Sequence, residues 1–328
     1  MRAVRCEQYG PPTSVVVAEV DEPVAAEGQV VVDVVAAAAN FPDVLVVADQ
    51  YQVSIPVPFT VGSEFAGTVS SVGPGVDGWA VGDRVMGSVL FGAFADRVAV
   101  SAGALQPVDP AIDLVSAAAS GVAHRTAYHA LRSFARVQPG AWVVVLGAAG
   151  GVGLAAVELA TLLGAKAVAA ASTEAKLALC AERGAVAGVN YTTENLKERI
   201  KAVTGGGADA VIDPVGGPAA EQALRALSWG GRFVTVGFAS GEIPKIPLNL
   251  VLLKGVIVTG FTMGGFATNQ RDDFLRDQDE LAELYRSGRF TPHISARYGL
   301  DGAGRALEDL AERRALGKVV VVPSDPAA

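Results

Sequence analysis

The sequence predicts an α/β protein made of a β-barrel domain and a doubly wound parallel sheet of six strands. Residues 1–120 contain short valine-rich runs separated by Gly and Pro, which is typical of antiparallel strands joined by turns. From residue 122 to residue 262, strand-like runs alternate with helical segments, as in a parallel sheet with helices on both faces. We therefore expect residues 1–122 and 263–328 to form one domain and residues 123–262 the other.

The first region contains five runs that predict strands. Its turn sequence VGPGVDG favours a closed antiparallel barrel over an open parallel sheet. The predicted strands are SVVVAEV (14–20), QVVVDVVAAAA (29–39), AGTVSSVG (66–73), GDRVMG (82–87) and AFADRVAV (93–100).

The second region supplies the six strands of the parallel sheet. They are predicted at WVVVL (142–146), KAVAAA (166–171), AVAGVN (185–190), DAVID (209–213), RFVTVG (232–237) and VIVTG (256–260). Helices are expected near 151–164, 174–183, 194–204 and 218–228. A charged helix (272–288), another helix near 301–314 and a final strand, GKVVVV (317–322), follow.

Composition narrows the classes of function. The 328 residues carry 26 basic and 34 acidic side chains, a net charge of −8, which argues against a general binder of nucleic acid or anionic membranes. Two cysteines, Cys6 and Cys180, cannot form a disulfide framework, and they fit a reducing, cytoplasmic setting. The start lacks the apolar segment of a signal peptide. The uncharged stretch 137–157 is interrupted by Pro139 and several Gly, so we interpret it as a strand entering a turn and not as a membrane span.

The strongest motif is VVVLGAAGGVGLAAVELA, residues 143–160. A strand, a glycine turn and a helix follow in the order that aims a helix N-terminus at a pyrophosphate. In this turn, AAGGVG (148–153), Gly150 makes the close turn, Gly151 lets the backbone approach the phosphates, and Gly153 lets the helix pack on the strand. A flavodoxin-like or purely structural turn has a similar pattern, but the alternating units around it favour dinucleotide binding. The turn residues predicted to contact the dinucleotide are Ala149, Gly150, Gly151, Val152 and Gly153.

The tip of the second strand of this domain predicts which dinucleotide is bound. An NAD-specific unit places Asp or Glu there for the ribose 2′-hydroxyl, whereas this chain has Ser172 and Thr173, with Lys176 in the next helix. These groups and Tyr191 accommodate a 2′-phosphate, so NADPH is predicted over NADH. The alternative is an ordinary helix start in which Ser172 or Thr173 is the N-cap. Glu174, if turned inwards, would oppose the phosphate.

Further motifs extend over nearly the whole chain. They are NFPDVL (40–45), GSEFAG (62–67), VGDRV (81–85), AAGGVG (148–153), NY (190–191), DPVGG (213–217) and ALGKVV (315–320). With them the sequence resembles the zinc-independent quinone oxidoreductase branch of the medium-chain dehydrogenase/reductase superfamily. The resemblance implies a GroES-like barrel domain completed by the C-terminal segment, a Rossmann domain, a substrate cleft between them, and NADPH-dependent reduction. It also implies a homodimer or homotetramer, for which the strand at 256–260 offers an exposed edge.

The resemblance also implies that zinc is not used. Zinc-dependent relatives have Cys where this chain has Asn40 and His where it has Ser63. Catalytic zinc needs three protein ligands and an open position, which Glu64 alone cannot provide. The three histidines, at 124, 129 and 293, are scattered, and each is interpreted as a surface or packing residue.

Positions matched to the family carry the predicted roles. Asn40 would orient the nicotinamide carboxamide or the acceptor oxygen, and Tyr51 would donate a hydrogen bond or a proton. The alternatives are a turn cap for Asn40 and a packed loop aromatic for Tyr51. Further contacts implied by the resemblance are Thr126, Gly237 and Phe238 at the nicotinamide side, Phe261 and Met263 as an apolar wall or simple core, and Arg314 and Lys318 at phosphates.

These positions imply an NADPH:quinone oxidoreductase-like enzyme that passes hydride to a quinone or another conjugated carbonyl acceptor. An alternative is an enoyl-thioester reductase acting on enoyl-CoA or acryloyl-CoA. The absence of a clear basic cluster for a CoA arm mildly disfavours it. A second alternative is a non-enzymatic protein that binds a dinucleotide or RNA, against which stand the acidic balance and the presence of Asn40 and Tyr51.

Overall fold

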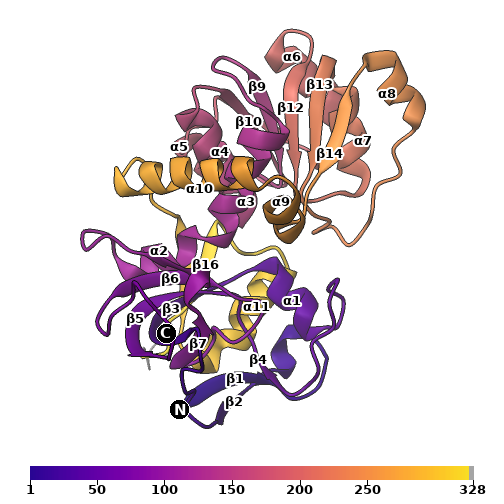
Figure 1. Cartoon of the computed structure of the whole chain (residues 1–328). Coiled ribbons are helices and arrows are strands. Elements are labelled where there is room, and N and C mark those ends of the chain that lie inside the picture. Colours follow the sequence, from indigo (N-terminus) through magenta and orange to yellow (C-terminus); the bar gives the residue numbers. More distant parts are fainter. Residues whose placement is uncertain (325–328) are drawn as a thin grey trace. The chain divides into compact units, whose positions relative to one another are not determined.

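The computed structural model describes residues 1–324 and divides into two compact units (Figure 1). Unit 1 comprises residues 1–122 and the chain from Thr291 onward, and unit 2 comprises Ala123–Phe290. The expected boundary after residue 262 differs from this division. Residues 263–290 belong to unit 2, and their side chains pair with residues near its start: Asp277 with His129 at 3.0 Å and Glu280 with Tyr128 at 2.8 Å.

Unit 1 is organised around the long strand β3 (Gln29–Ala39), which pairs with three other strands. One sheet has the order β15-β16-β3-β5-β6-β8, with β7 also on β3, and a second sheet has the order β2-β1-β4. All strand pairs are antiparallel except β15–β16. An isolated antiparallel bridge between Ala3 and Ala95 connects β1 to the chain just before β7. The expected strands are present, but within residues 1–324 their ladders form two sheets and not one closed ring. The other strands are β1 (Arg2–Cys6), β2 (Val16–Glu19), β4 (Phe59–Thr60), β5 (Glu64–Val72), β6 (Arg84–Ser88), β7 (Arg97–Ser101), β8 (Leu105–Pro107), β15 (Ile294–Tyr298) and β16 (Lys318–Val321).

Short helices close the core of unit 1. Alternate valines of β3 point inward with Phe59, Phe65 and Phe94, all of them buried. The predicted C-terminal strand is confirmed as β16, which pairs with the end of β3 and completes the sheet from the far end of the chain. The helical elements are α1 (Phe41–Val47), α2 (Leu114–Ser120), α11 (Ala303–Ala311) and the single turns η1 (Pro12–Ser14), η2 (Ala102–Ala104) and η4 (Leu300–Gly302).

Unit 2 contains the predicted doubly wound sheet. Its six strands are all parallel and have the order β11-β10-β9-β12-β13-β14. The central strands are continuous runs of buried Val and Ala because helices cover both faces. The strands are β9 (Trp142–Leu146), β10 (Lys166–Ala171), β11 (Ala187–Asn190), β12 (Ala208–Asp213), β13 (Leu227–Thr235) and β14 (Ile257–Gly260).

The helices of unit 2 begin close to the expected residues. The helix expected at 218–228 ends at Arg225, because Leu227 already pairs with Ala208 as the start of β13. The stretch 137–157 forms β9, a turn and the start of α4, as predicted, and no helix within residues 1–324 is long and apolar enough to cross a membrane. The helices are α3 (Val122–His129), which begins one residue before the unit, η3 (Ala130–Phe134), α4 (Gly151–Leu162), α5 (Glu174–Glu182), α6 (Leu196–Thr204), α7 (Gly217–Arg225), α8 (Leu248–Lys254), α9 (Met263–Asn269) and α10 (Arg271–Arg286).

Candidate functional site

The glycine turn of unit 2 presents an uncapped helix end. Gly150 is the N-cap of α4, and no side-chain oxygen accepts from the first turn of the helix. The amides of Gly151, Val152 and Gly153 therefore point along the axis toward a position suited to an anion. A Cβ on Gly153 would lie 2.2 Å from the carbonyl oxygen of Gly147, so only Gly lets α4 pack this closely on the end of β9. The turn fits the pyrophosphate of a dinucleotide.

The tip of β10 brings together three of the predicted residues. The Lys176 ammonium donates to the Ser172 hydroxyl at 3.3 Å, and the Thr173 hydroxyl accepts from the Lys176 backbone N–H at 3.3 Å. Thr173 is therefore the N-cap of α5, while Ser172 and Lys176 present a hydroxyl beside a positive charge. Glu174 accepts from the Asn190 side chain at 2.8 Å, which fixes its carboxylate against the end of β11.

The other residues of unit 2 that were predicted to contact the cofactor lie on different elements. Gly237 and Phe238 follow β13, and Phe238 is 39 % exposed. Thr126 on α3 and Tyr191 after β11 are half-buried, and Tyr191 packs against the core of the sheet. These residues share unit 2 with the glycine turn.

The expected apolar wall is part of a cluster of aromatic rings. Phe261 stacks on Phe134 with ring centroids 4.3 Å apart, and it meets Phe266 edge-on at 6.0 Å. Met263 opens α9 and is half-buried. The packing interpretation therefore accounts for the position of Phe261.

In unit 1 the structure assembles a buried polar cluster around Asn40. Asn40 follows β3, Glu64 opens β5 and Lys318 opens β16, so three strand ends converge. The Lys318 ammonium donates to Asn40 Oδ1 at 2.6 Å, to Glu64 Oε2 at 3.1 Å and to the Ala39 carbonyl at 3.4 Å. Asn40 Nδ2 donates to Glu64 Oε2 at 3.0 Å and to the Ala38 carbonyl at 3.1 Å.

Two carboxyl groups complete the cluster. Glu64 Oε1 accepts from the Val122 backbone N–H at 2.6 Å, and Asp43 Oδ2 accepts from the Asn40 backbone N–H at 2.8 Å. Burial raises the pKa of Asp43 to about 6, although hydrogen bonds from Ser63 and Asn40 act in the opposite direction. Neither Asp43 nor Glu64 was predicted as a site residue. Asp43 had a sequence signal, since it stands three residues after Asn40 as in a capping box.

Both cations expected at phosphates are engaged with carboxylates. Lys318 lies on a strand, its residue is 3 % exposed, and its ammonium is inside the cluster just described, so it does not face solvent. Arg314 follows α11 and pairs with Asp309 at 2.8 Å, with Glu308 at 3.2 Å, and with Glu312. A phosphate contact of Lys318 stays a prediction, and in the structure the buried charge of this residue is paired with Glu64.

Tyr51 packs against the barrel core as a half-buried side chain. Its hydroxyl has no hydrogen-bond partner within residues 1–324. The ring of Tyr51 therefore packs as the alternative interpretation expected. Its hydroxyl is free to donate a proton or a hydrogen bond.

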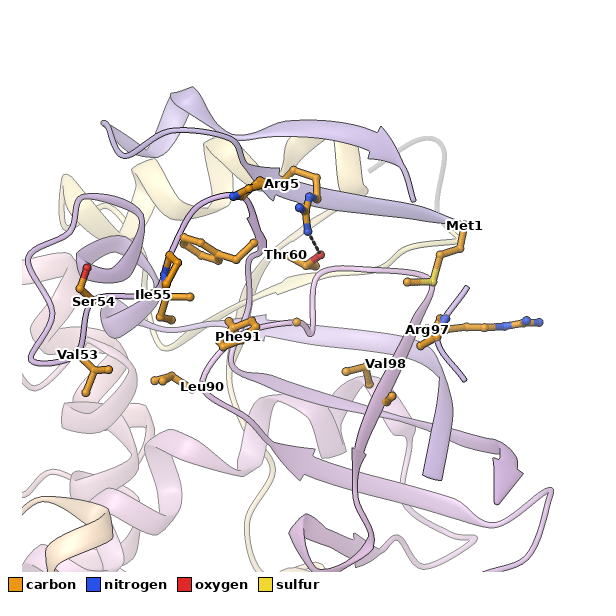
Figure 2. Close-up of a pocket in the computed structure, with 16 residues that line it drawn as sticks. Met1, Arg5, Val53, Ser54, Ile55, Thr60, Leu90, Phe91, Arg97 and Val98 are labelled. Atoms are coloured by element: carbon orange, nitrogen blue, oxygen red, sulfur yellow. Dashed lines mark hydrogen bonds between the residues drawn. The ribbon is translucent and has the colours of Figure 1, made fainter. Parts of the chain in front are cut away.

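A cavity of about 540 Å³ opens in unit 1 beside the loop that follows Tyr51 (Figure 2). Apolar side chains dominate its lining, including Val53, Ile55, Leu90 and Phe91. Arg5 at its wall donates to Thr60 at 3.1 Å. No residue predicted to be catalytic or to contact the cofactor lines this cavity, so it is distinct from the Asn40 cluster.

The histidines have separate surroundings. His124 lies 3.7 Å from Glu158 and stacks on Phe290, and His129 Nδ1 lies 3.0 Å from Asp277. Across residues 1–324, no three His, Cys, Asp or Glu side chains are grouped so that they could hold a metal ion. His129 is buried, stacks on Phe274 with ring centroids 5.0 Å apart, and has Asp277 as its carboxylate partner.

Comparison with known proteins identifies the family. Residues 26–110 match the alcohol dehydrogenase GroES-like domain, and residues 151–280 match the family described as zinc-binding dehydrogenase. The chain is 36 % identical to the quinone oxidoreductase-like protein 2 homolog of Nematostella vectensis, over 98 % of this chain and 88 % of that protein. It is 33 % identical to quinone oxidoreductase 1 of Escherichia coli K12, over 91 % of this chain and 92 % of that protein.

Solved structures agree with these matches. The crystal structure of Escherichia coli quinone oxidoreductase complexed with NADPH has a TM-score of 0.91 at 31 % identity, and the match covers 98 % of this chain and 100 % of that one. The resemblance drawn from the motifs is thereby confirmed, as is the combination of a GroES-like unit with a Rossmann unit. The chain belongs to the quinone oxidoreductase branch of the medium-chain dehydrogenase/reductase superfamily and is an oxidoreductase of that class.

Proposed function

We propose that this protein is an NADPH-dependent reductase that transfers hydride to a quinone or another conjugated carbonyl acceptor without zinc. The observation that carries the proposal is the uncapped α4 N-terminus together with the Ser172–Lys176 pair at the tip of β10. The first suits a pyrophosphate, and the second suits a ribose 2′-phosphate. NADPH, when bound, supplies the hydride, and the protein supplies binding, orientation and electrostatics.

The Asn40 cluster supports reduction of an electrophilic acceptor. Asn40 and Ser63 stand where zinc-dependent relatives carry Cys and His, and the buried cation beside Asn40 is the Lys318 ammonium. Without a Lewis acid, oxidation of an alcohol is difficult, whereas an already conjugated carbonyl accepts hydride readily. Tyr51 is the proposed proton donor to the reduced acceptor, since its hydroxyl carries no other hydrogen bond in the part of the chain that is described.

The direct test is NADPH oxidation by metal-free protein. Parallel reactions contain 9,10-phenanthrenequinone, crotonyl-CoA or no acceptor, each with NADPH and with NADH. We expect turnover with the quinone and NADPH above the reaction without acceptor. Faster turnover with crotonyl-CoA would move the protein to the enoyl-thioester reductases, and NADPH binding without any turnover would support a binding protein instead.

Lys176→Ala is expected to weaken NADPH binding by about 1–2 kcal/mol and to leave NADH binding nearly unchanged, because one charge-assisted hydrogen bond to the 2′-phosphate is lost. Calorimetric titration with both cofactors measures the effect. Lys197→Ala, which removes a surface cation paired with Glu198, is the matched control. Equal losses for NADPH and NADH in Lys176→Ala would refute the assignment.

Tyr51→Phe is expected to slow turnover of an enone roughly tenfold more than turnover of a quinone. The carbanion formed from an enone needs a positioned proton, whereas a reduced quinone takes its proton from solvent. Steady-state rates with both acceptors measure the difference. If both rates match those of the wild type, the Tyr51 side chain has a packing role alone.

We further propose a cytoplasmic homodimer that pairs through the edge of β14. Ile257 and Val258 are 43 % and 44 % exposed on this edge strand, and Leu252 on the neighbouring helix α8 is 79 % exposed. Two copies of β14 in antiparallel contact would satisfy the free backbone groups and cover this apolar surface. Val258→Arg is expected to convert a dimeric mass in light scattering into a monomeric one. A monomeric wild type would refute the proposal.

A further inference from the structure

Glu174 places a carboxylate at the tip of β10, where the proposed function puts a ribose 2′-phosphate. It is the first residue of α5 and lies two residues from both Ser172 and Lys176. Consecutive Cα atoms are about 3.8 Å apart, so the Cα of Glu174 lies within about 7.6 Å of the Cα atoms of these two residues. A carboxylate and a phosphate at such separations repel each other, most strongly at low ionic strength. The placement of this carboxylate therefore bears on the choice between NADPH and NADH.

The carboxylate of Glu174 is held by the buried side chain of Asn190. Asn190 ends β11 and is 6 % exposed, whereas Glu174 is exposed. Asn190 Nδ2 donates to Glu174 Oε1 at 2.8 Å. The parallel register explains the contact, because Asn190 lies beside Ala171, the last residue of β10, and α5 begins shortly after that residue. The carboxylate is thus hydrogen-bonded to the neighbouring strand.

The other partners of Asn190 fix which way its side-chain amide points. Asn190 Oδ1 accepts from the Thr192 backbone N–H at 3.2 Å and from the Thr192 hydroxyl at 2.6 Å. A backbone N–H can only donate, so the amide atom beside it is the oxygen. An ionised carboxylate can only accept, so the amide atom beside Glu174 is the nitrogen. Asn190 is therefore both buried and oriented as a donor to Glu174.

We propose that Asn190 is a positioning residue for cofactor choice, which holds the Glu174 carboxylate against β11 and so keeps it from the 2′-phosphate. Without this donor, the exposed Glu174 side chain is free to turn, and its charge disfavours the phosphate. NADH has at this place an uncharged 2′-hydroxyl, which can donate to a carboxylate. Loss of the donor should therefore weaken the binding of NADPH relative to that of NADH. This inference rests on the proposed function, since it takes the 2′-phosphate to bind at the tip of β10.

The alternative is a hydrogen bond that only joins α5 to β11. In that case, loss of Asn190 would lower stability and would affect the binding of both cofactors alike. A positioning role makes a different prediction, because Asn190 then acts through the charge of Glu174. Removal of that charge must cancel the effect of losing Asn190 on the preference for NADPH.

The test measures the dissociation constants of NADPH and NADH by calorimetry at low ionic strength, without an acceptor. Asn190→Ala is expected to reduce the preference for NADPH about three- to tenfold. Glu174→Gln, which keeps the shape of the side chain without its charge, should keep or increase the wild-type preference. Asn190→Ala combined with Glu174→Gln should regain it. Glu182→Gln, which removes an exposed carboxylate from the last residue of α5, is the matched control and should keep the wild-type ratio.

Asn190→Ala removes buried hydrogen bonds and can prevent folding. Glu174→Asp is the second variant, since it leaves Asn190 intact and keeps the charge, but its side chain is one methylene shorter and does not reach Asn190 Nδ2. We expect it to lower the preference for NADPH, although Glu174→Gln does not. The wild-type ratio in Glu174→Asp would overturn the inference. So would a loss in Asn190→Ala that persists when Glu174→Gln is added.

The ratio of dissociation constants does not depend on turnover. Quinone inactivity with the expected ratios would refute the proposed function and leave the role of Asn190 standing. Quinone reduction with NADPH, together with the wild-type ratio in the Asn190 and Glu174→Asp variants, would refute only this inference. A wild type that binds NADH as tightly as NADPH would refute both the role of Asn190 and the proposed cofactor.

Discussion

Gly153→Ala is expected to destabilise unit 2 by about 3 kcal/mol and to weaken NADPH binding by at least tenfold. The added Cβ would lie 2.2 Å from the Gly147 carbonyl oxygen and 2.8 Å from the Ala148 Cα, which are backbone atoms that no side-chain rotation can move. Ala favours a helix over Gly by about 1 kcal/mol, which is smaller than the cost of this overlap. The helix must therefore shift, and the amides of its first turn shift with it.

Gly150→Ala is the matched control in the same turn. Gly150 has φ −80°, which any residue adopts, and its nearest atom to an added Cβ is 3.4 Å away. Urea denaturation of both variants and calorimetric titration with NADPH separate the two effects. We expect Gly150→Ala to unfold within about 1 kcal/mol of the wild type. A Gly153→Ala protein as stable as the wild type would show that α4 is not held by this contact.

Local patterns were sufficient to predict most of the fold. Alternating and continuous valine runs placed the strands, and the order of strand, glycine turn and helix at 143–160 placed the cofactor turn. Each of these signals lies within a short window, where side-chain period and turn chemistry decide the local structure. The same is true of Ser172, Thr173 and Lys176, which are within one helical turn of each other.

The Asn40 cluster could not be predicted in this way, because its members meet through tertiary structure. Lys318 lies 278 residues from Asn40 and 254 residues from Glu64 in the chain, and its proximity to them depends on β16 pairing with β3. From the sequence, Lys318 was predicted only as a contact for a phosphate. Similarly, residues 263–290 were assigned to the barrel domain. The hydrogen bonds between α10 and the helices α3 and η3 join residues far apart in the chain, so the local sequence does not predict them.

One of these hydrogen-bonded residues, Asp277, is expected to have a second large effect on stability. Asp277 on α10 is fully buried, and it accepts from His129 at 3.0 Å, from Ser133 at 2.6 Å and twice from Arg276. Asp277→Ala removes all of these acceptors and is expected to destabilise unit 2 by about 3 kcal/mol, because buried donors lose their partner. Glu280→Ala, on the same helix but with a side chain 35 % exposed, is expected to stay within about 1 kcal/mol of the wild type.

The stabilisation provided by Asp277 should depend on pH in a defined direction. Burial by itself raises the pKa of Asp277, but hydrogen bonds from His129, Ser133 and Arg276 outweigh burial and hold the pKa below its ordinary value. An acid with a lowered pKa stabilises the fold above the pKa of the unfolded chain, about 4, and loses that contribution as the pH falls through its folded value. The gap in unfolding free energy between wild type and Asp277→Ala should therefore be full at pH 7 and shrink toward pH 3. Urea denaturation across this range measures the gap. A gap that is constant with pH would mean that Asp277 acts through its shape and not through its charge.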